Sequence, residues 1–338
     1  MAFPSFRACG MVALLWGVAA PILAQMGEAV DPLRAAREEK RQQRLSVVEG
    51  WGLEQLLRTQ QELDYKQKFR ASTSSNPDEL SLLAGDEDSG VRFYAATNRY
   101  TPREVLLDLA YDSAAYVRAG VAMSLFQDVG DSPAMRRLIE QIALLLAGDP
   151  QVLVRLALAQ NEGVPSTVCD SMAHDPDPIV RQKLAANEHA TPNALEVLAQ
   201  DSVLAVQTKA LVHRNLPLTR LEAMGLDPQV EVRLAVCHNP LAPVDVLDAL
   251  AADPDARVRQ AVALHPNTAL STLEKMTTDS EPGVLIAVSN HPRADRNMLT
   301  RLARDGKDGP VRVAARQRLL PLLRSEIRED VLERWDSR

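Results

Sequence analysis

The sequence predicts an all-α protein, an α-solenoid of about ten two-helix repeats of about 26 residues with helical caps at both ends. Three observations support this class. A Val-Arg pair, or a close variant of it, recurs along the chain at a regular interval. Glycine is scarce, with 15 residues in 338, which disfavours an all-β fold with many turns. Aromatic residues make up only 4%, so the apolar residues are mainly aliphatic and suit closely packed small helices.

The recurring pair sets the register of the repeats. Its nine intervals are 22, 26, 37, 26, 26, 26, 26, 26 and 27 residues, so six of the nine are identical. We number positions within a repeat from the first residue of the pair, position 0, so that the arginine stands at +1. The ten residues at position 0 are Phe69, Val91, Val117, Val154, Val180, Val206, Val232, Val258, Val284 and Val311.

Two charged columns keep this register. An aspartate at −5, often followed by proline, is expected to cap the first helix of each repeat, because its carboxylate accepts amide hydrogens that have no partner inside the helix. Arginine at +1 is expected to form a ladder of ion pairs with these aspartates between adjacent repeats; the alternative is an acidic and basic strip that binds a charged partner. The residues assigned to the ladder include Asp175, Arg181, Asp227, Arg233, Asp253 and Arg259.

Each repeat contains two short helical stretches. Positions 0, +3 and +4 are small or aliphatic, as in Val232, Ala235 and Val236, and form one helix face. A helix-breaking Asn-Pro or His-Pro pair follows near +7, as at Asn239, and a second stretch has leucine at +15, as at Leu247. Such short helices are marginal in isolation, so they must bury their apolar faces against neighbouring repeats.

The pattern D-P-D-x-x-V-R-x-x-V-A-x-N-P-x-T-P-x-x-x-L-x-x-L-A resembles the leucine-rich-repeat-variant family of bacterial repeats and, more loosely, HEAT repeats. The resemblance covers 69–318. It implies a right-handed superhelix of paired helices with a binding or scaffolding role. Some members of that family carry an iron–sulfur cluster on a cysteine-rich N-terminal segment. This chain has no C-x-x-C motif, and 31–69 contains no cysteine, so we do not expect a cluster or any other cofactor.

The N-terminus is typical of a secretory signal. Arg7 is the only charged residue before Glu28, and the intervening segment is apolar. We expect 1–24 to be a signal peptide that is cleaved after Ala24, which makes the mature protein periplasmic or secreted without stable membrane insertion. The alternative is an uncleaved N-terminal membrane anchor. Either topology exports the folded part of the chain.

The remaining segments lie at the ends of the repeat array and at one irregular interval. Residues 25–68 are charged and helical in pattern and are expected to cap the N-terminal end, as 319–338 cap the other. The interval of 37 residues contains an insertion around 125–147, in which Ser132 and Pro133 are expected to begin a long helix that ends near Ala147.

The histidines and cysteines could suggest a metal site or a disulfide. His213, His265 and His291 share position +7 with asparagines of other repeats, so we expect both residue types to bind backbone groups where the first helix ends, rather than a metal. Cys169 and Cys237 occupy different apolar columns three repeats apart, beyond the reach of a disulfide, and are expected to be buried free thiols.

Composition and motifs favour a binding protein over an enzyme. The net charge of −7 and the few aromatic residues disfavour nucleic-acid binding. The common nucleophile, zinc, dinucleotide and phosphate-loop motifs are absent from the sequence. We therefore expect a non-catalytic exported scaffold that binds a protein or peptide; the alternative is an enzyme, or a cofactor-maturation or assembly factor, that uses the solenoid groove.

One surface of the first helices is the candidate binding site. Positions +2 and +6 lie roughly opposite the 0, +3, +4 face, yet they carry apolar side chains that vary between repeats. They are interpreted either as a groove for a helix or extended peptide, or as residues that the repeat itself buries. The residues assigned to the groove are Phe93, Leu156, Leu234, Leu264 and Ile286.

Overall fold

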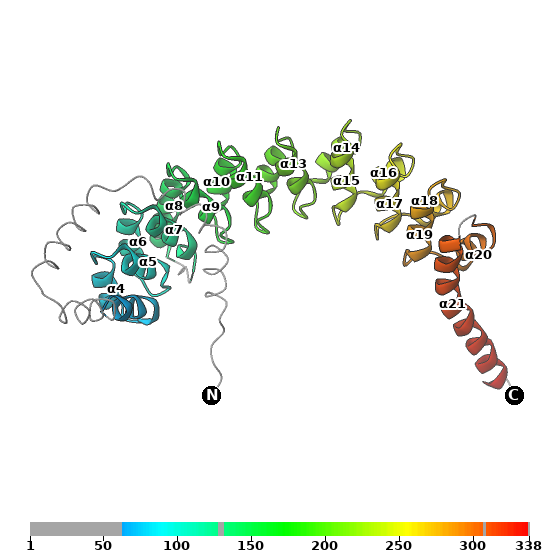
Figure 1. Cartoon of the computed structure of the whole chain (residues 1–338), viewed down its shortest axis with the longest axis horizontal. Coiled ribbons are helices and arrows are strands. Elements are labelled where there is room, and N and C mark those ends of the chain that lie inside the picture. The colour runs from blue at the N-terminus through cyan, green and yellow to red at the C-terminus, as the bar shows by residue number, and fades with distance from the viewer. Residues whose placement is uncertain (1–62, 128–131, 307–308, 337–338) are drawn as a thin grey trace, which may run out of the picture. The chain divides into compact units, whose positions relative to one another are not determined.

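Short helices follow one another along the chain, as the repeat pattern predicts (Figure 1). The computed structural model describes 63–127, 132–306 and 309–336. Within these ranges the secondary structure is entirely helical and contains no strand, which confirms the all-α class. Lys68–Arg338 form one unit, and it contains all the helices named below. The predicted signal peptide and nearly all of the predicted N-terminal cap lie outside the described residues.

Two sets of helices alternate in this unit. The first helices, which contain positions 0 to +5, are α5 (Ser89–Thr97), α7 (Ala115–Ser124), α9 (Val152–Ala159), α11 (Pro178–Ala185), α13 (Leu204–Leu211), α15 (Val230–His238), α17 (Ala256–Leu264) and α19 (Pro282–Asn290). The second helices are α6 (Arg103–Leu109), α8 (Pro133–Ala147), α10 (Ser166–Met172), α12 (Pro192–Leu198), α14 (Leu218–Met224), α16 (Val244–Leu250), α18 (Leu270–Met276) and α20 (Arg296–Asp305). Helices α4 (Pro77–Leu83) and α21 (Gly309–Asp336) precede and follow them.

The expectation that the aspartate at −5 caps the first helix is wrong. The residue two positions later is the N-cap: Asp177 caps α11 and accepts the amide of Ile179 at 2.8 Å, with Pro178 as the first helical residue. Asp175 lies in the preceding turn, where its Oδ1 accepts the amide of Asp177 at 2.8 Å. Aspartate commonly binds the backbone two residues further on in this way, so the column stabilises the turn that leads into the helix.

The core lies where each first helix packs between its neighbours and the second helices. The first helices, from α5 to α19, each pack on the first helix of the next repeat, and α19 packs on α21. Positions 0, +4 and +5 form the buried face, as Val180, Leu184 and Ala185 do in α11. Position +3 varies, since Lys183 is exposed where Ala235 is buried. The leucine at +15 of the second helix, such as Leu195, completes the core.

The irregular interval changes the second helix of its repeat. Helix α8 begins with Pro133, directly after Ser132, and ends with Ala147, at the positions expected. It has 15 residues, whereas α10 and α12 have seven each. Helices α7 and α9 still pack directly on each other. The repeat therefore keeps its two-helix arrangement and accommodates the added residues in α8 and the connection before it.

The C-terminal end differs from the predicted division at 318/319. Helix α21 is continuous from Gly309 to Asp336, so position 0 of the last repeat, Val311, and the described part of the predicted capping segment, 319–336, share one helix, which contains Pro321. It packs against α19 and α20. Among the helices described, none is long and apolar enough to cross a membrane.

Truncation of a column leucine tests the packing. Leu247 in α16 is fully buried, and Leu247→Ala is expected to lower the free energy of unfolding by about 2–5 kcal/mol because it removes buried methyl groups and leaves a cavity. Leu270→Ala in α18 is the matched control, since Leu270 is half-exposed. Urea denaturation of both variants measures the difference, and equal small losses would show that the register is wrong.

Candidate functional site

A ladder of ion pairs connects successive repeats. In each rung an arginine at +1 binds the aspartate at −5 of the next repeat with two parallel hydrogen bonds. Nε of Arg155 donates to Oδ2 of Asp175 at 2.7 Å, and its Nη2 donates to Oδ1 at 3.1 Å. Its Nη1 donates at 2.8 Å to the backbone oxygen of Asp149, in its own repeat. The described part of the chain contains six rungs: Arg92–Asp112, Arg118–Asp149, Arg155–Asp175, Arg181–Asp201, Arg233–Asp253 and Arg259–Asp279.

The rungs are shielded from solvent. The side chains of Arg155 and Asp175 are 9% and 2% exposed. The hydrogen bond to Asp175 raises the pKa of Arg155, although burial opposes its charge. Burial likewise opposes the charge of Asp201, but hydrogen bonds from Arg181 and the Val203 amide outweigh it and lower the pKa of that carboxyl. Each rung is thus a charge-neutral crosslink with most of its hydrogen-bonding groups occupied, so we assign it a structural role.

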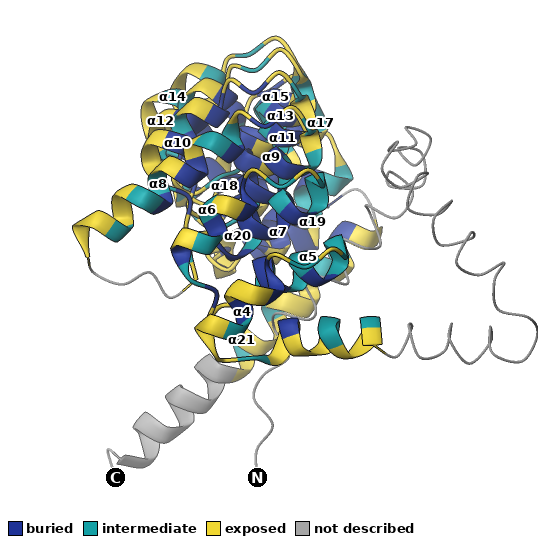
Figure 2. Cartoon of the chain, turned by 90° about the vertical axis from the view of Figure 1, so that its left-hand side faces the viewer, coloured by how far each residue is buried: buried dark blue, intermediate teal, exposed yellow. Residues whose placement is uncertain are grey.

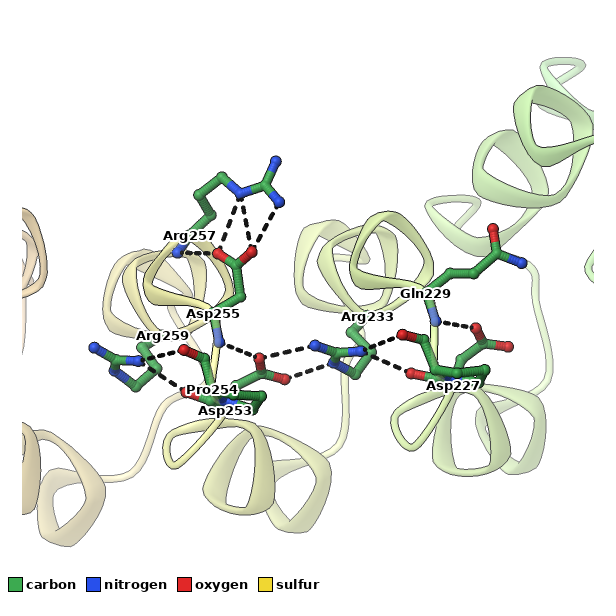
Figure 3. Close-up of polar contacts among 9 residues, drawn as sticks. Asp227, Gln229, Arg233, Asp253, Pro254, Asp255, Arg257 and Arg259 are labelled. Carbon is green, nitrogen blue, oxygen red and sulfur yellow. Dashed lines mark hydrogen bonds and ion pairs between the residues drawn. The ribbon is translucent and has the colours of Figure 1, made fainter.

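The ladder is interrupted where arginine is replaced. Gln207 in α13 and Leu285 in α19 stand at +1 of their repeats. Asp227, which the sequence places in the ladder, therefore has no arginine partner among the described residues. Its Oδ1 still accepts the amide of Gln229 at 2.8 Å, as Asp253 accepts the amide of Asp255 (Figure 3).

A second ladder runs through position +7. Nδ2 of Asn239 donates to the backbone oxygens of Leu211 and His213 at 2.7 and 2.9 Å, and its Oδ1 accepts the amide of Leu241. Histidine makes the equivalent contacts: Nε2 of His265 lies 2.9 Å from the backbone oxygen of Asn239, and its Nδ1 accepts the amide of Asn267 at 3.1 Å. The structure thus confirms that Asn and His bind backbone groups at this position.

The histidine rungs require neutral rings. Because the Asn267 amide donates to Nδ1 of His265, the only ring proton is on Nε2, where it donates to the previous repeat. Burial lowers the pKa of His213, His265 and His291. In the described part of the chain, no group of three or more His, Cys, Asp or Glu side chains is arranged to hold a metal ion.

Both described cysteines are free and buried, as expected. Burial raises the pKa of the Cys169 thiol to about 11 and that of Cys237 to about 12. Nucleophilic attack requires the thiolate, so such thiols react slowly. We expect a thiol reagent at pH 8 to modify neither residue rapidly in the native protein and both after unfolding in urea; rapid native labelling followed by mass spectrometry would contradict their burial.

The five residues of the predicted groove do not share one environment. Phe93, Leu156, Leu234 and Ile286 are partly buried and pack against the hydrophobic core. Leu264, at the end of α17, is 54% exposed. A first helix contacts the helices before and after it as well as a second helix, which covers more of its circumference than a single apolar face.

The structure shows a different apolar column on the second helices. Position +12, the first residue of α14, α16 and α18, is occupied by Leu218, Val244 and Leu270, which are 48%, 46% and 49% exposed. Figure 2 shows exposed residues along the second helices and buried residues where they meet the first helices. The spacing of 26 residues between these aliphatic residues is visible in the sequence, but only their exposure distinguishes this column from the buried ones.

Comparison with known proteins adds no functional information. No protein-family model matches the chain, and no curated protein is significantly similar to it.

Proposed function

We propose that the chain is a non-catalytic scaffold for protein–protein interaction, built as a right-handed α-solenoid of about ten repeats of the leucine-rich-repeat-variant type. Support for the solenoid comes from first helices that pack in series and from rungs that link adjacent repeats. Each repeat then contacts mainly its neighbours, and equivalent positions form long columns on the surface. The N-terminal segment supports export to the periplasm or the exterior through a signal peptide.

The exposed aliphatic column at +12 carries the proposal. Leu218, Val244 and Leu270 stand at the same position of three consecutive repeats, and each leaves about half of its surface exposed. A repeated exposed apolar position does not contribute fully to the core, and its recurrence in successive repeats of a solenoid aligns these side chains along one surface that a partner with regularly spaced apolar residues can contact. A protein partner with an apolar helix or strand is the class of ligand that fits such a column.

Charge introduction at this column is the test. The triple variant Leu218→Glu, Val244→Glu, Leu270→Glu is immobilised and compared with the wild type for capture of proteins from a periplasmic extract. Its melting temperature is expected to stay close to that of the wild type because the side chains are half-exposed. Capture of a specific partner is expected to fall at least about tenfold, a loss of about 1.4 kcal/mol in binding free energy.

The matched control changes charge without changing apolar surface. Lys183→Glu and Lys209→Glu alter exposed residues on α11 and α13. This double variant should retain the partner. If a folded triple variant captures the partner as well as the wild type does, or if both variants lose it equally, the column at +12 is not the interaction surface.

A further inference from the structure

The six arginine rungs define a guanidinium-binding geometry that the repeat backbone provides. Arg233 shows its parts: Nε and Nη2 donate to the Asp253 carboxylate at 2.6 and 3.0 Å, and Nη1 donates to the backbone oxygens of Asp227 and Pro228 at 2.8 and 3.1 Å (Figure 3). The carboxylate comes from the following repeat, and the two carbonyls come from the turn that precedes the first helix. Guanidinium is planar and presents parallel donors, which matches this set of acceptors.

One repeat inside the array retains the acceptors without the arginine. At α13 the equivalent carbonyls are those of Asp201 and Ser202, and the equivalent carboxylate is that of Asp227. Gln207 stands where the arginine would be, and its neutral side chain is too short to span both sets of acceptors. Asp86, at the start of the series, also has no arginine partner in the described residues, because Arg70, at +1 of the first repeat, pairs with Glu79 instead.

The Asp227 carboxylate is held in the orientation that the other rungs use. Its Oδ1 accepts the Gln229 amide at 2.8 Å, and Asp253 accepts the Asp255 amide at the same distance (Figure 3). Asp253 also accepts two hydrogen bonds from the Arg233 guanidinium, whereas no arginine of the described residues pairs with the Asp227 carboxylate. Asp227 is partly exposed, so a group from solvent can approach it. Arg233 attracts the Asp227 charge, but its guanidinium donates to the backbone oxygen of Asp227 and to the Asp253 carboxylate, which leaves the second oxygen of the Asp227 carboxylate for another donor.

We propose that this junction between α13 and α15 binds the guanidinium group of an arginine side chain of a partner protein. That the arginine comes from a partner protein rests on the proposed scaffold function. That the site binds guanidinium does not depend on that function. Leu226, which precedes Asp227, is 83% exposed, and Leu218 in α14 is 48% exposed. These side chains provide apolar surface in the same repeat for the residues that flank the arginine. Lysine, a point charge without a planar fork, fits the acceptor set less well.

Binding of a small probe tests the site directly. Protein labelled with ¹⁵N-glutamine is titrated with N-acetyl-arginine amide, and the backbone amide of Gln229 and the side-chain amide of Gln207 are followed by NMR. We expect saturable shifts of both signals with the arginine probe, and an affinity at least about tenfold lower for the lysine and citrulline analogues, because they lack the charged fork. Equal shifts with citrulline, which is neutral, would overturn the proposal.

Two variants and one control locate the site. Gln207→Arg supplies the guanidinium from within the chain and is expected to abolish probe binding and raise the melting temperature. Asp227→Asn is expected to weaken probe binding at least about tenfold through loss of the carboxylate charge. Gln260→Arg makes the same chemical change at an exposed position of α17 and should leave binding and melting unchanged. Unchanged probe binding in Gln207→Arg would overturn the proposal, as would a melting temperature no higher than that of Gln260→Arg.

Partner capture tests whether the partner protein supplies the arginine. If the partner supplies the arginine, the Gln207→Arg variant captures the partner less well than the Gln260→Arg variant does. A partner peptide with citrulline in place of that arginine is then captured equally by both variants. Probe binding with unchanged capture would overturn the partner's arginine as the source and leave the scaffold function intact. If the triple variant at +12 loses capture while Gln207→Arg retains it, the scaffold function stands and the partner's arginine is not bound at this junction.

Discussion

Arg155→Ala is expected to lower the free energy of unfolding by about 3–5 kcal/mol, because it leaves the Asp175 carboxylate buried without its cation. Both side chains are among the most buried of the rungs, and the substitution also removes the hydrogen bonds to the backbone oxygens of Asp149 and Pro150. The turns before two first helices lose a shared crosslink. Chemical denaturation monitored by circular dichroism measures the loss.

Arg257→Ala is the matched control. Arg257 pairs with Asp255 in its own repeat, and its side chain is 61% exposed (Figure 3). Exposed pairs are screened by water and contribute little to stability, so this variant should unfold like the wild type. If Arg155→Ala were as stable as Arg257→Ala, the ladder would not hold the repeats together.

Acidification below about pH 6.5 is expected to destabilise the protein through the histidine rungs. Burial lowers the pKa of His213, His265 and His291 in the folded state. The unfolded chain therefore binds more protons between these lowered values and the unfolded value of about 6.5, so stability is present above that pH and is lost as the pH falls. The slope reaches up to about 1.4 kcal/mol per pH unit for each histidine that titrates.

Neighbouring charges act in different directions on these rings. Glu188 favours the charged form of His213, whereas Lys209 and Arg214 oppose it. His238 opposes the charge of His265, and Arg293 opposes that of His291. Protonation at Nδ1 would also turn the acceptor of a backbone amide into a donor, which breaks the contact with the following turn.

Replacement of the three histidines by asparagine tests this assignment. Asparagine makes the same contacts at Asn187 and Asn239, so His213→Asn, His265→Asn and His291→Asn together should preserve stability at pH 7.5. The triple variant should lose less stability between pH 7 and pH 5 than the wild type does. Melting curves across this range provide the comparison, and parallel curves for the two proteins would assign the acid sensitivity to other groups.

The sequence is sufficient to predict the two-helix repeat and the residues that share a column. The interval of 26 residues predicts that positions 0 and +15 belong to the core of each repeat. Val180 and Leu195, which occupy these positions in one repeat, are both fully buried. It also places Arg155 twenty residues before Asp175, a spacing that recurs in five of the six rungs. Periodicity alone therefore indicates which residue types lie side by side.

The assignment of individual roles required the structure. The D-P-D segment contains two aspartates that can cap a helix, and only the structure shows that Asp177 caps α11 while Asp175 binds the turn and the arginine. Exposure at +2 was equally ambiguous, since Leu234 and Ile286 are apolar whether they face a groove or a neighbour. A side chain's burial depends on all the helices around it, and helical periodicity describes only one of them.

We propose that the repeats form a linear array in which each contacts mainly its neighbours. Spin labels on cysteines at position +12 test this most directly: Ser166→Cys is combined in turn with Leu218→Cys, Val244→Cys and Leu270→Cys, all at exposed positions, while the native thiols stay buried. Packed helices lie about 10 Å apart, so the distances measured by pulsed electron paramagnetic resonance should rise by about that amount per repeat, to about 20, 30 and 40 Å. A distance to position 270 that is no longer than the distance to position 218 would contradict the array.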